Sequence, residues 1–219
     1  MRSLASVPLV AIALLLGACS GSEPVEKVAP TSTLPEPTEF SGYVRTPRLD
    51  VSSVTLPAAD GTPVNMVAKP GGLRLVYFGY TTCPDVCPTT LGFVKMAYLD
   101  LSKADQDRVD VDMISIDPSR DTAEKLSKYV ALFVPSANAI RTDDQVQLRA
   151  AAKAFGAAYK TSVNFEGERE VSHTDDLYAV DDTGTVILAW PFGISQPDFE
   201  RDLLRLLAGE RPEVEEPTN

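Results

Sequence analysis

The stretch that decides the fold is LRLVYFGYTTCPDVCPTTL, which runs from Leu73 to Leu91. Its first part, residues 73–80, is a short apolar run rich in aromatic side chains, which is typical of a buried strand. A loop with Cys83 and Cys87 follows, and residues 89–103 then repeat apolar side chains at close to the helical period. The stretch therefore predicts a strand that leads into a helix, with two cysteines at the junction.

The sequence on both sides of this stretch alternates strand and helix signals, in the order hairpin, strand, helix, strand, helix, short strand, helix, hairpin, helix. We expect Asp121 or Ser119 to cap the second helix. This order predicts an α/β fold of the thioredoxin-like type, with a central mixed sheet flanked by helices and an extra N-terminal β-hairpin. The expected elements outside the opening stretch are a hairpin over 54–66, a strand over 109–116, helices over 121–133, 143–159 and 196–207, and a hairpin of strands 176–180 and 185–190.

Both ends of the chain fall outside the predicted domain, which we place at residues 41–209. Residues 1–18 have the apolar run of an export signal, too short for a membrane-spanning helix, and they precede Cys19 as in bacterial lipoproteins. We predict that Cys19 carries the lipid, and that the protein lies on the extracytoplasmic face of the bacterial cell membrane. The alternative is an ordinary signal peptide with a chance cysteine. Residues 19–40 read as a flexible tether, and 210–219 as an acidic tail.

The overall composition limits the partners. The chain of 219 residues is 44% apolar, which suits one folded domain, and its formal net charge is −11. Because a protein must bring cations to phosphate, this charge argues against nucleic acid as a partner.

Cysteine use narrows the chemistry. The chain has three cysteines. If Cys19 is lipidated, only Cys83 and Cys87 remain. A disulfide between them would close a very small loop and remove little entropy from the unfolded chain, so a structural role is disfavoured. Near a helix start, unpaired N–H groups and the macrodipole favour a thiolate at Cys87. Thiol–disulfide exchange and metal binding remain open.

Three features favour a metal. The spacing is Cys-x-x-x-Cys, not the Cys-x-x-Cys usual in redox thioredoxins. No proline stands between Pro135 and Pro191, where those enzymes place a cis-proline before the penultimate strand. His173, the single histidine of the chain, stands there instead. Two thiolates and an imidazole suit copper, because thiolates select Cu(I). Zinc would need a fourth ligand, for which Asp85 and Asp117 are the candidates.

Three ordered motifs resemble the Sco/SenC family, in its bacterial lipoprotein form: residues 76–91, 115–122 and 171–174. The resemblance covers about residues 40–208. It implies a thioredoxin-like fold with extra N-terminal strands, and copper, as Cu(I) or Cu(II), held by Cys83, Cys87 and His173. It also implies a role in supplying or preparing the dinuclear copper centre in subunit II of cytochrome c oxidase. Asp117 matches an acidic residue near the metal, and Arg120 is expected to order that loop by pairing with a carboxylate.

The sequence departs from the family pattern at two positions. Thr82 stands where many members have histidine, and Ser172 where many have aspartate before the ligand histidine. Neither position is a metal ligand in the family, so the implied ligands Cys83, Cys87 and His173 are all present. A carboxylate beside the histidine could orient its ring, and Ser172 would do so more weakly.

Three functions follow as hypotheses. The first is a copper chaperone, which is not an enzyme and would receive copper from another chaperone. The second is a thiol–disulfide reductase whose redox pair, Cys83 and Cys87, reduces the acceptor's copper-site cysteines and is itself restored by a thiol reductant. The third is a redox or copper sensor that signals through a partner.

Overall fold

A computed structural model gives the structure of residues 39–213. The predictions for the signal peptide, for Cys19, for the tether up to residue 38 and for the tail from residue 214 lie outside these residues. Within 39–213 no helix is long and apolar enough to cross a bilayer.

The strands are β1 (Thr55–Pro57), β2 (Pro63–Asn65), β3 (Leu73–Gly79), β4 (Val109–Ser115), β5 (Asn138–Ile140), β6 (Tyr159–Val163), β7 (Arg169–His173), β8 (Leu177–Val180) and β9 (Val186–Trp190); the helices are α1 (Val86–Asp100), α2 (Lys103–Gln106), α3 (Ala123–Ala131), α4 (Gln145–Ala154) and α5 (Gln196–Leu207).

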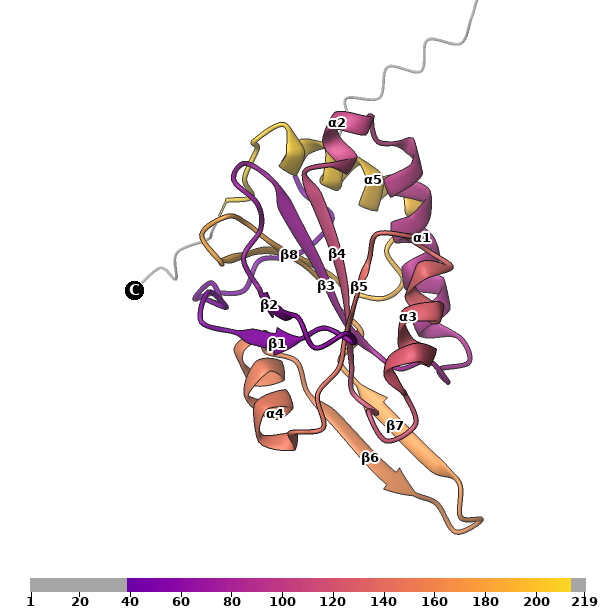
Figure 1. The fold of residues 1–219 in the computed structure, drawn as a ribbon. Helices are drawn as coiled ribbons and strands as arrows, with labels where there is room; N and C mark the ends of the chain where they lie inside the picture. The colour runs from indigo at the N-terminus through magenta and orange to yellow at the C-terminus, as the bar shows by residue number, and fades with distance from the viewer. Residues whose placement is uncertain (1–38, 214–219) are drawn as a thin grey trace, which may run out of the picture. The chain divides into compact units, whose positions relative to one another are not determined.

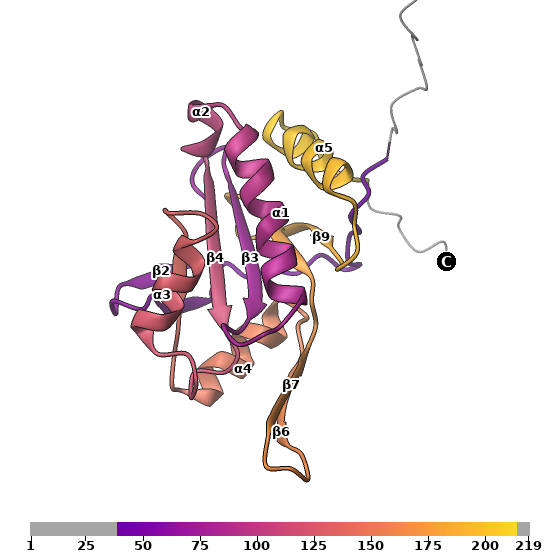
Figure 2. The ribbon, with the colours of Figure 1, turned by 90° about the vertical axis from the view of Figure 1, so that its right-hand side faces the viewer.

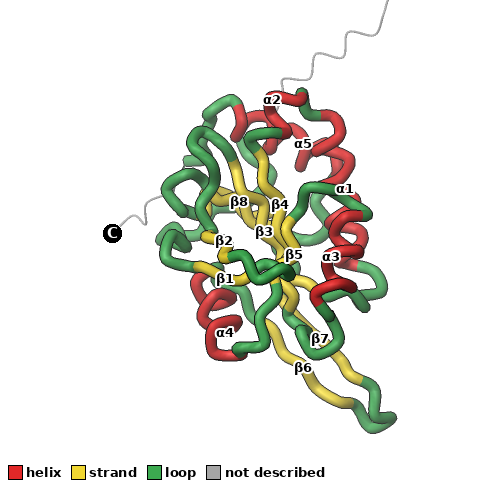
Figure 3. The backbone as a smooth tube through the Cα atoms, in the orientation of Figure 1, coloured by secondary structure: helices red, strands yellow, loops and turns green. Residues whose placement is uncertain are grey.

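A mixed five-stranded sheet forms the centre, with the order β5-β4-β3-β8-β9. Figure 3 shows β5, β4, β3 and β8 in yellow at the centre of the domain. β3 pairs parallel with β4, and β4 parallel with β5, whereas β8 runs antiparallel to both β3 and β9. Every side chain of β3 is buried, as its continuous apolar run predicts. The predicted α/β fold with a central mixed sheet is confirmed.

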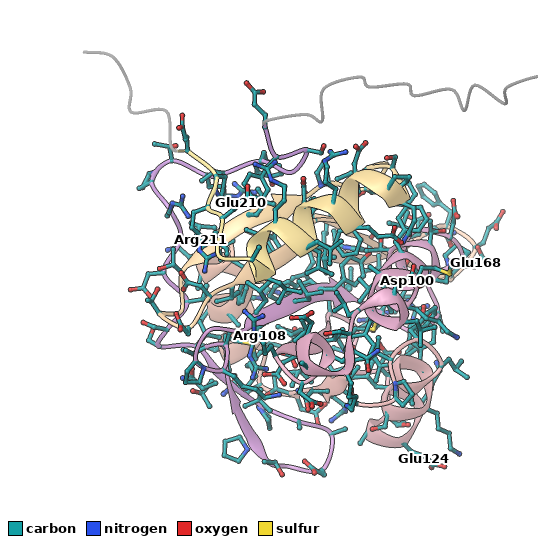
Figure 4. The ribbon with its side chains drawn as sticks, turned by 90° about the horizontal axis from the view of Figure 1, so that it is seen from above. Asp100, Arg108, Glu124, Glu168, Glu210 and Arg211 are labelled. Carbon is teal, nitrogen blue, oxygen red and sulfur yellow. The ribbon has the colours of Figure 1, made fainter. Side chains whose placement is uncertain are left out.

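Helices cover both faces of this sheet. Because each parallel pair needs a crossover, and crossovers are right-handed, α1 and α3 fall on the same face. Figure 2 is viewed from this face, with α3 beside β4, α1 beside β3 and α5 beside α1. The opposite face carries α4 and the β1–β2 hairpin (Figure 1). Arg108, labelled in Figure 4, donates to the carbonyl of Leu207 at the end of α5 over 2.9 Å.

The structure corrects several expected boundaries. α1 begins at Val86, so Cys87 lies in its first turn and not in a loop. Pro88 is compatible with this because the first turn leaves its N–H groups unpaired in any case. Thr122, not Asp121 or Ser119, caps α3, and its side chain accepts the N–H of Lys125.

Two further differences concern the segment before His173. The helix expected over 143–159 ends at Ala154, after which Gly156 takes a φ of +63°. A second antiparallel pair, β6 and β7, then follows where no strand was expected, and His173 is the last residue of β7 rather than part of a loop.

The N-terminal segment of the domain also differs from the prediction. Glu39 and Phe40, assigned to the tether, contact α5: Arg205 donates to the carbonyl of Glu39 over 3.1 Å, and its guanidinium lies 4.1 Å from the centre of the Phe40 ring. Three residues further on, the backbone of Tyr43 pairs with Ala189 of β9.

Candidate metal centre

Cys83 and Cys87 meet at the point where β3 ends and α1 begins. Both are free thiols; Cys83 is half-buried and Cys87 buried. The backbone N–H of Cys87 donates to Cys83 Sγ over 3.3 Å. An unpaired N–H group at this helix start therefore donates to the sulfur of Cys83, whereas the sequence led us to expect these groups to stabilise a thiolate at Cys87.

Cys87 itself is enclosed by the core. Its side chain has no exposed surface, and burial raises the pKa of its thiol to about 12, with the neighbouring Cys83 contributing in the same direction. The expected stabilisation of a Cys87 thiolate is therefore wrong for the metal-free protein, because desolvation outweighs the helix terminus.

His173 reaches these thiols from a distant part of the chain. Its Nε2 lies 4.0 Å from Cys87 Sγ. Its Nδ1 lies 2.7 Å from the carbonyl oxygen of Thr174. The carbonyl can only accept, so Nδ1 carries the proton and Nε2 presents its lone pair to the sulfur. Thr174 is fixed in turn, because its N–H donates to the carbonyl of Ala158 over 2.8 Å. The orienting group for the ring is thus the carbonyl of Thr174, not the side chain of Ser172.

Two tyrosines complete the walls of the site. The rings of Tyr77 and Tyr80 meet the imidazole edge to face, with centroids 6.1 and 5.9 Å away. The Tyr77 hydroxyl donates to Cys87 Sγ over 3.7 Å. Burial raises the pKa of Tyr77 well above its ordinary value, so this hydroxyl keeps its proton. The sequence could not separate these tyrosines from ordinary core aromatics, since both belong to the apolar run over residues 73–80.

The arrangement fits a soft metal ion. Bonds of about 2.3 Å to sulfur and about 2.0 Å to nitrogen, spread at a wide angle, place the two donors about 4 Å apart, as Cys87 Sγ and His173 Nε2 are here. A metal-ligating histidine usually donates its other N–H to a carbonyl or carboxylate, and His173 does so. Among residues 39–213, no three Cys, His, Asp or Glu side chains already form a closed metal-binding group, so the sulfurs would have to shift on binding.

The two candidate carboxylates are placed differently. Asp117 is fully buried and is engaged by Arg120, as expected for that arginine, and by Arg169, whose Nε lies 3.1 Å from Asp117 Oδ1. These contacts occupy its oxygens with protein donors. Asp85 is exposed at the start of α1 and caps no backbone N–H; it only accepts from Thr89 Oγ1 over 3.5 Å.

A third carboxylate, Asp121, supports the site although the sequence suggested only a helix cap for it. It is fully buried. It accepts the backbone N–H of Thr81 at 3.2 Å and the hydroxyl of Ser115 at 2.7 Å. Asp121 therefore ties the end of β4 to the loop that leads into Cys83.

Comparisons with known proteins identify the family and the fold. The sequence matches the SCO1/SenC family over residues 49–208. The apo Sco1 protein from Thermus thermophilus is 32% identical, with a TM-score of 0.67 over 76% of this chain and 96% of that chain. ScoI of Bradyrhizobium japonicum, solved with copper bound, is 27% identical, with a TM-score of 0.60 over 69% of this chain and 96% of that chain.

A curated relative gives a similar result. The SCO2-like protein of Rickettsia prowazekii is 33% identical over 131 residues, which are 59% of this chain and 63% of that protein. The chain covers 60%, 64% and 63% of the length of the first three curated relatives that it matches.

Proposed function

Because the chain belongs to the SCO1/SenC family, we propose that it is a copper-carrying assembly factor that binds the ion through Cys83, Cys87 and His173. The cargo is copper, as Cu(I) or Cu(II). The acceptor that the family resemblance implies is the dinuclear copper centre in subunit II of cytochrome c oxidase. A copper-bound relative that aligns over 69% of this chain supports the choice of metal.

The observation that carries this proposal is the position of the imidazole. His173 Nε2 faces Cys87 Sγ at 4.0 Å, although 86 positions separate the two residues. Its proton is held on Nδ1 by Thr174, so the nitrogen that faces the thiols is the one able to bind a metal. A plain dithiol oxidoreductase has no need of a basic nitrogen held at this position.

The chemistry of loading follows from the protonation states. Both thiols lose a proton when copper binds, and the ion replaces those protons as the partner of the sulfurs. For Cys87 the ion must overcome the raised pKa of the buried thiol, and the hydroxyl of Tyr77 remains as a hydrogen-bond donor to the thiolate formed. Copper then passes to the acceptor when thiolates of the acceptor replace Cys83, Cys87 and His173 one after another.

Titration of the reduced, tag-free protein with Cu(I) tests the proposal. We expect one ion per chain, and an affinity at least about tenfold lower for His173→Ala, since a ligand is lost. Cys83→Ser and Cys87→Ser should lower it further. Ser172→Ala is the matched control, because Ser172 neighbours the histidine on the exposed face of β7 and should bind as the unaltered protein does. Equal affinity of His173→Ala and the unaltered protein would refute the site.

The reductase function is the second candidate, supported by the free pair of thiols. In that case Cys83→Ser abolishes reduction of a disulfide in the acceptor's copper-binding domain, while His173→Ala leaves it intact. Loss of acceptor loading in His173→Ala with unchanged disulfide reduction therefore favours copper delivery.

We also propose that a lipid on Cys19 anchors the protein to the extracytoplasmic face of the membrane. The sequence before Cys19 supports this. Mass spectrometry of the membrane fraction should find a diacylated N-terminal Cys19, and Cys19→Ala should move the protein to the soluble fraction. A Cys19→Ala protein that stays with the membrane would contradict the anchor.

A further inference from the structure

The segment that carries His173 is held to the domain in an unusual way. β6 and β7, which we call the β6–β7 arm (residues 159–173), pair only with each other and not with the five-stranded sheet. Figure 1 shows the arm extending away from that sheet. Its position is therefore set mainly by side chains and by the connections at its base, and it can change without breaking the central sheet.

One face of β7 supplies these side chains. Because side chains alternate along a strand, Arg169, Val171 and His173 share a face. Arg169 pairs with Asp117, Val171 packs against the hydrophobic core, and His173 lies over Cys87. Glu170, on the other face, is exposed.

The ion pair of Arg169 is the polar part of this attachment. Asp117 has no exposed surface, and a carboxylate buried to this extent is stable only with cations and hydrogen-bond donors around it. Arg120 reaches it from its own loop and Arg169 from the arm. Arg120 also donates to the backbone carbonyl of Arg169 over 3.4 Å, which strengthens the same attachment.

A cavity of about 290 Å³ lies beside the ion pair, and Arg169 lines it. Asp143, which is exposed, lines the same cavity. The guanidinium therefore has space beside it when it leaves Asp117, whereas Asp143 is already paired with Arg141 over 2.7 Å. The remaining lining residues are Ile116, Pro118, Ser119, Gln145 and Thr161.

We propose that Arg169 is a positioning residue whose ion pair with Asp117 holds the β6–β7 arm where His173 faces the Cys87 sulfur. The inference rests on the proposed copper site and adds how its third ligand is placed and withdrawn. When Arg169 leaves Asp117, the arm moves and takes the imidazole with it. Copper then keeps two sulfurs, and the vacated position is open to a thiolate of the acceptor.

Arg169→Gln tests this directly, with Glu170→Gln as the matched control on the opposite face of the same strand. In the reduced, metal-free protein, amide hydrogen exchange should rise about tenfold in residues 159–173 of Arg169→Gln and stay unchanged in β3 and β4. Arg169→Lys, which keeps the charge, should recover part of the protection. Unchanged exchange in the arm of Arg169→Gln, or an equal rise in Glu170→Gln, would overturn the proposal.

Copper supplies the second measurement. Transfer of Cu(I) from Arg169→Gln to the chelator bicinchoninate should be about tenfold faster than from Glu170→Gln. In the Cu(II)-loaded protein, the nitrogen hyperfine splitting from His173 should weaken in Arg169→Gln only. If the arm of Arg169→Gln loosens but both copper measurements stay unchanged, the positioning role is overturned and the copper site stands. The proposed function itself fails only if His173→Ala binds copper as the unaltered protein does.

Discussion

At the scale of single residues, the two thiols of the site differ sharply. Cys87 lies in the core with a thiol pKa of about 12. Cys83 is half-buried and accepts a backbone N–H at the helix start. A buried thiol with a raised pKa is unreactive, whereas partial exposure and a donor N–H favour nucleophilic attack and first contact with an incoming ion. The pair is therefore asymmetric, with Cys83 as its entry point.

Alkylation of the reduced, metal-free protein checks this asymmetry. With iodoacetamide at pH 8, mass spectrometry should find Cys83 modified at least about a hundredfold faster than Cys87, because a pKa of about 12 in place of 9.0 leaves about a thousandfold less thiolate. Since the thiolate is the form that a raised pKa depletes, the Cys87 rate should climb about tenfold per pH unit up to about pH 12, as long as the fold holds.

Unfolding in urea is the control, because it should bring the two rates together. Equal alkylation rates in the folded protein would show that the thiol of Cys87 is neither buried nor raised in pKa.

At the scale of elements, the closeness of β3 and α1 depends on a glycine. A Cβ at Gly79 would lie 2.7 Å from the Tyr77 ring, 3.0 Å from Met113 and 3.1 Å from Cys87 Sγ. All three distances are shorter than normal contacts, and the neighbours are packed in the core. A glycine at the end of β3 therefore lets the sulfur of α1 approach the strand.

Gly79→Ala should destabilise the protein by about 2 kcal/mol and weaken copper binding, because the overpacked core must push Cys87 away. Gly92→Ala is the counterpart within α1, where a Cβ meets nothing within 4 Å. That change should stabilise by about 0.5–1 kcal/mol through helix propensity. Urea denaturation measures both. A Gly79→Ala protein as stable as the unaltered one would show that the two elements are less closely packed.

The elements also show what sequence can predict. The strand at Leu73, the hairpin of β8 and β9, and α5 were expected correctly, since the strands are short apolar runs and the helix has an apolar face at the helical period. The β6–β7 arm was missed, because its strands carry mostly exposed side chains and so have no apolar run. The Ala-rich run before it extended the expected helix to residue 159, past the turn at Gly156.

The candidate site divides in the same way. Cys83, Cys87 and His173 are identifiable from the sequence because sulfur and imidazole chemistry is rare and the chain has a single histidine. The ion pair of Arg169 with Asp117 cannot be identified in this way, and neither can the contact of the Thr174 carbonyl with His173. Both depend on the folded structure and leave no residue pattern in the sequence.

At the scale of the whole domain, the segment that precedes β1 is built into the fold through one buried carboxylate. Asp202 of α5 is fully buried. One of its oxygens accepts the N–H groups of Ser41 and Gly42, both at 2.9 Å, and Trp190 Nε1–H at 3.0 Å. The same segment carries Tyr43, whose hydroxyl donates to Asp176 near the base of the β6–β7 arm. Asp202 thus connects the N-terminal segment, α5 and β9.

Asp202→Leu keeps the branched shape of this side chain, with bulkier methyl groups in place of the oxygens, but removes its acceptors. Three donors then lose their partner, at about 1–3 kcal/mol for each one that stays buried, so we expect a loss of about 2–4 kcal/mol because part of the segment can move into water. Urea denaturation should show a lower midpoint with little change in slope, and trypsin should cut faster after Arg45 and Arg48. Leu204→Gln, an exposed change on the same helix, is the control and should keep both properties close to those of the unaltered protein. If Asp202→Leu matched that control, the N-terminal segment would be held by its other contacts, such as its pairing with β9 and the contacts of Arg205 with Glu39 and Phe40.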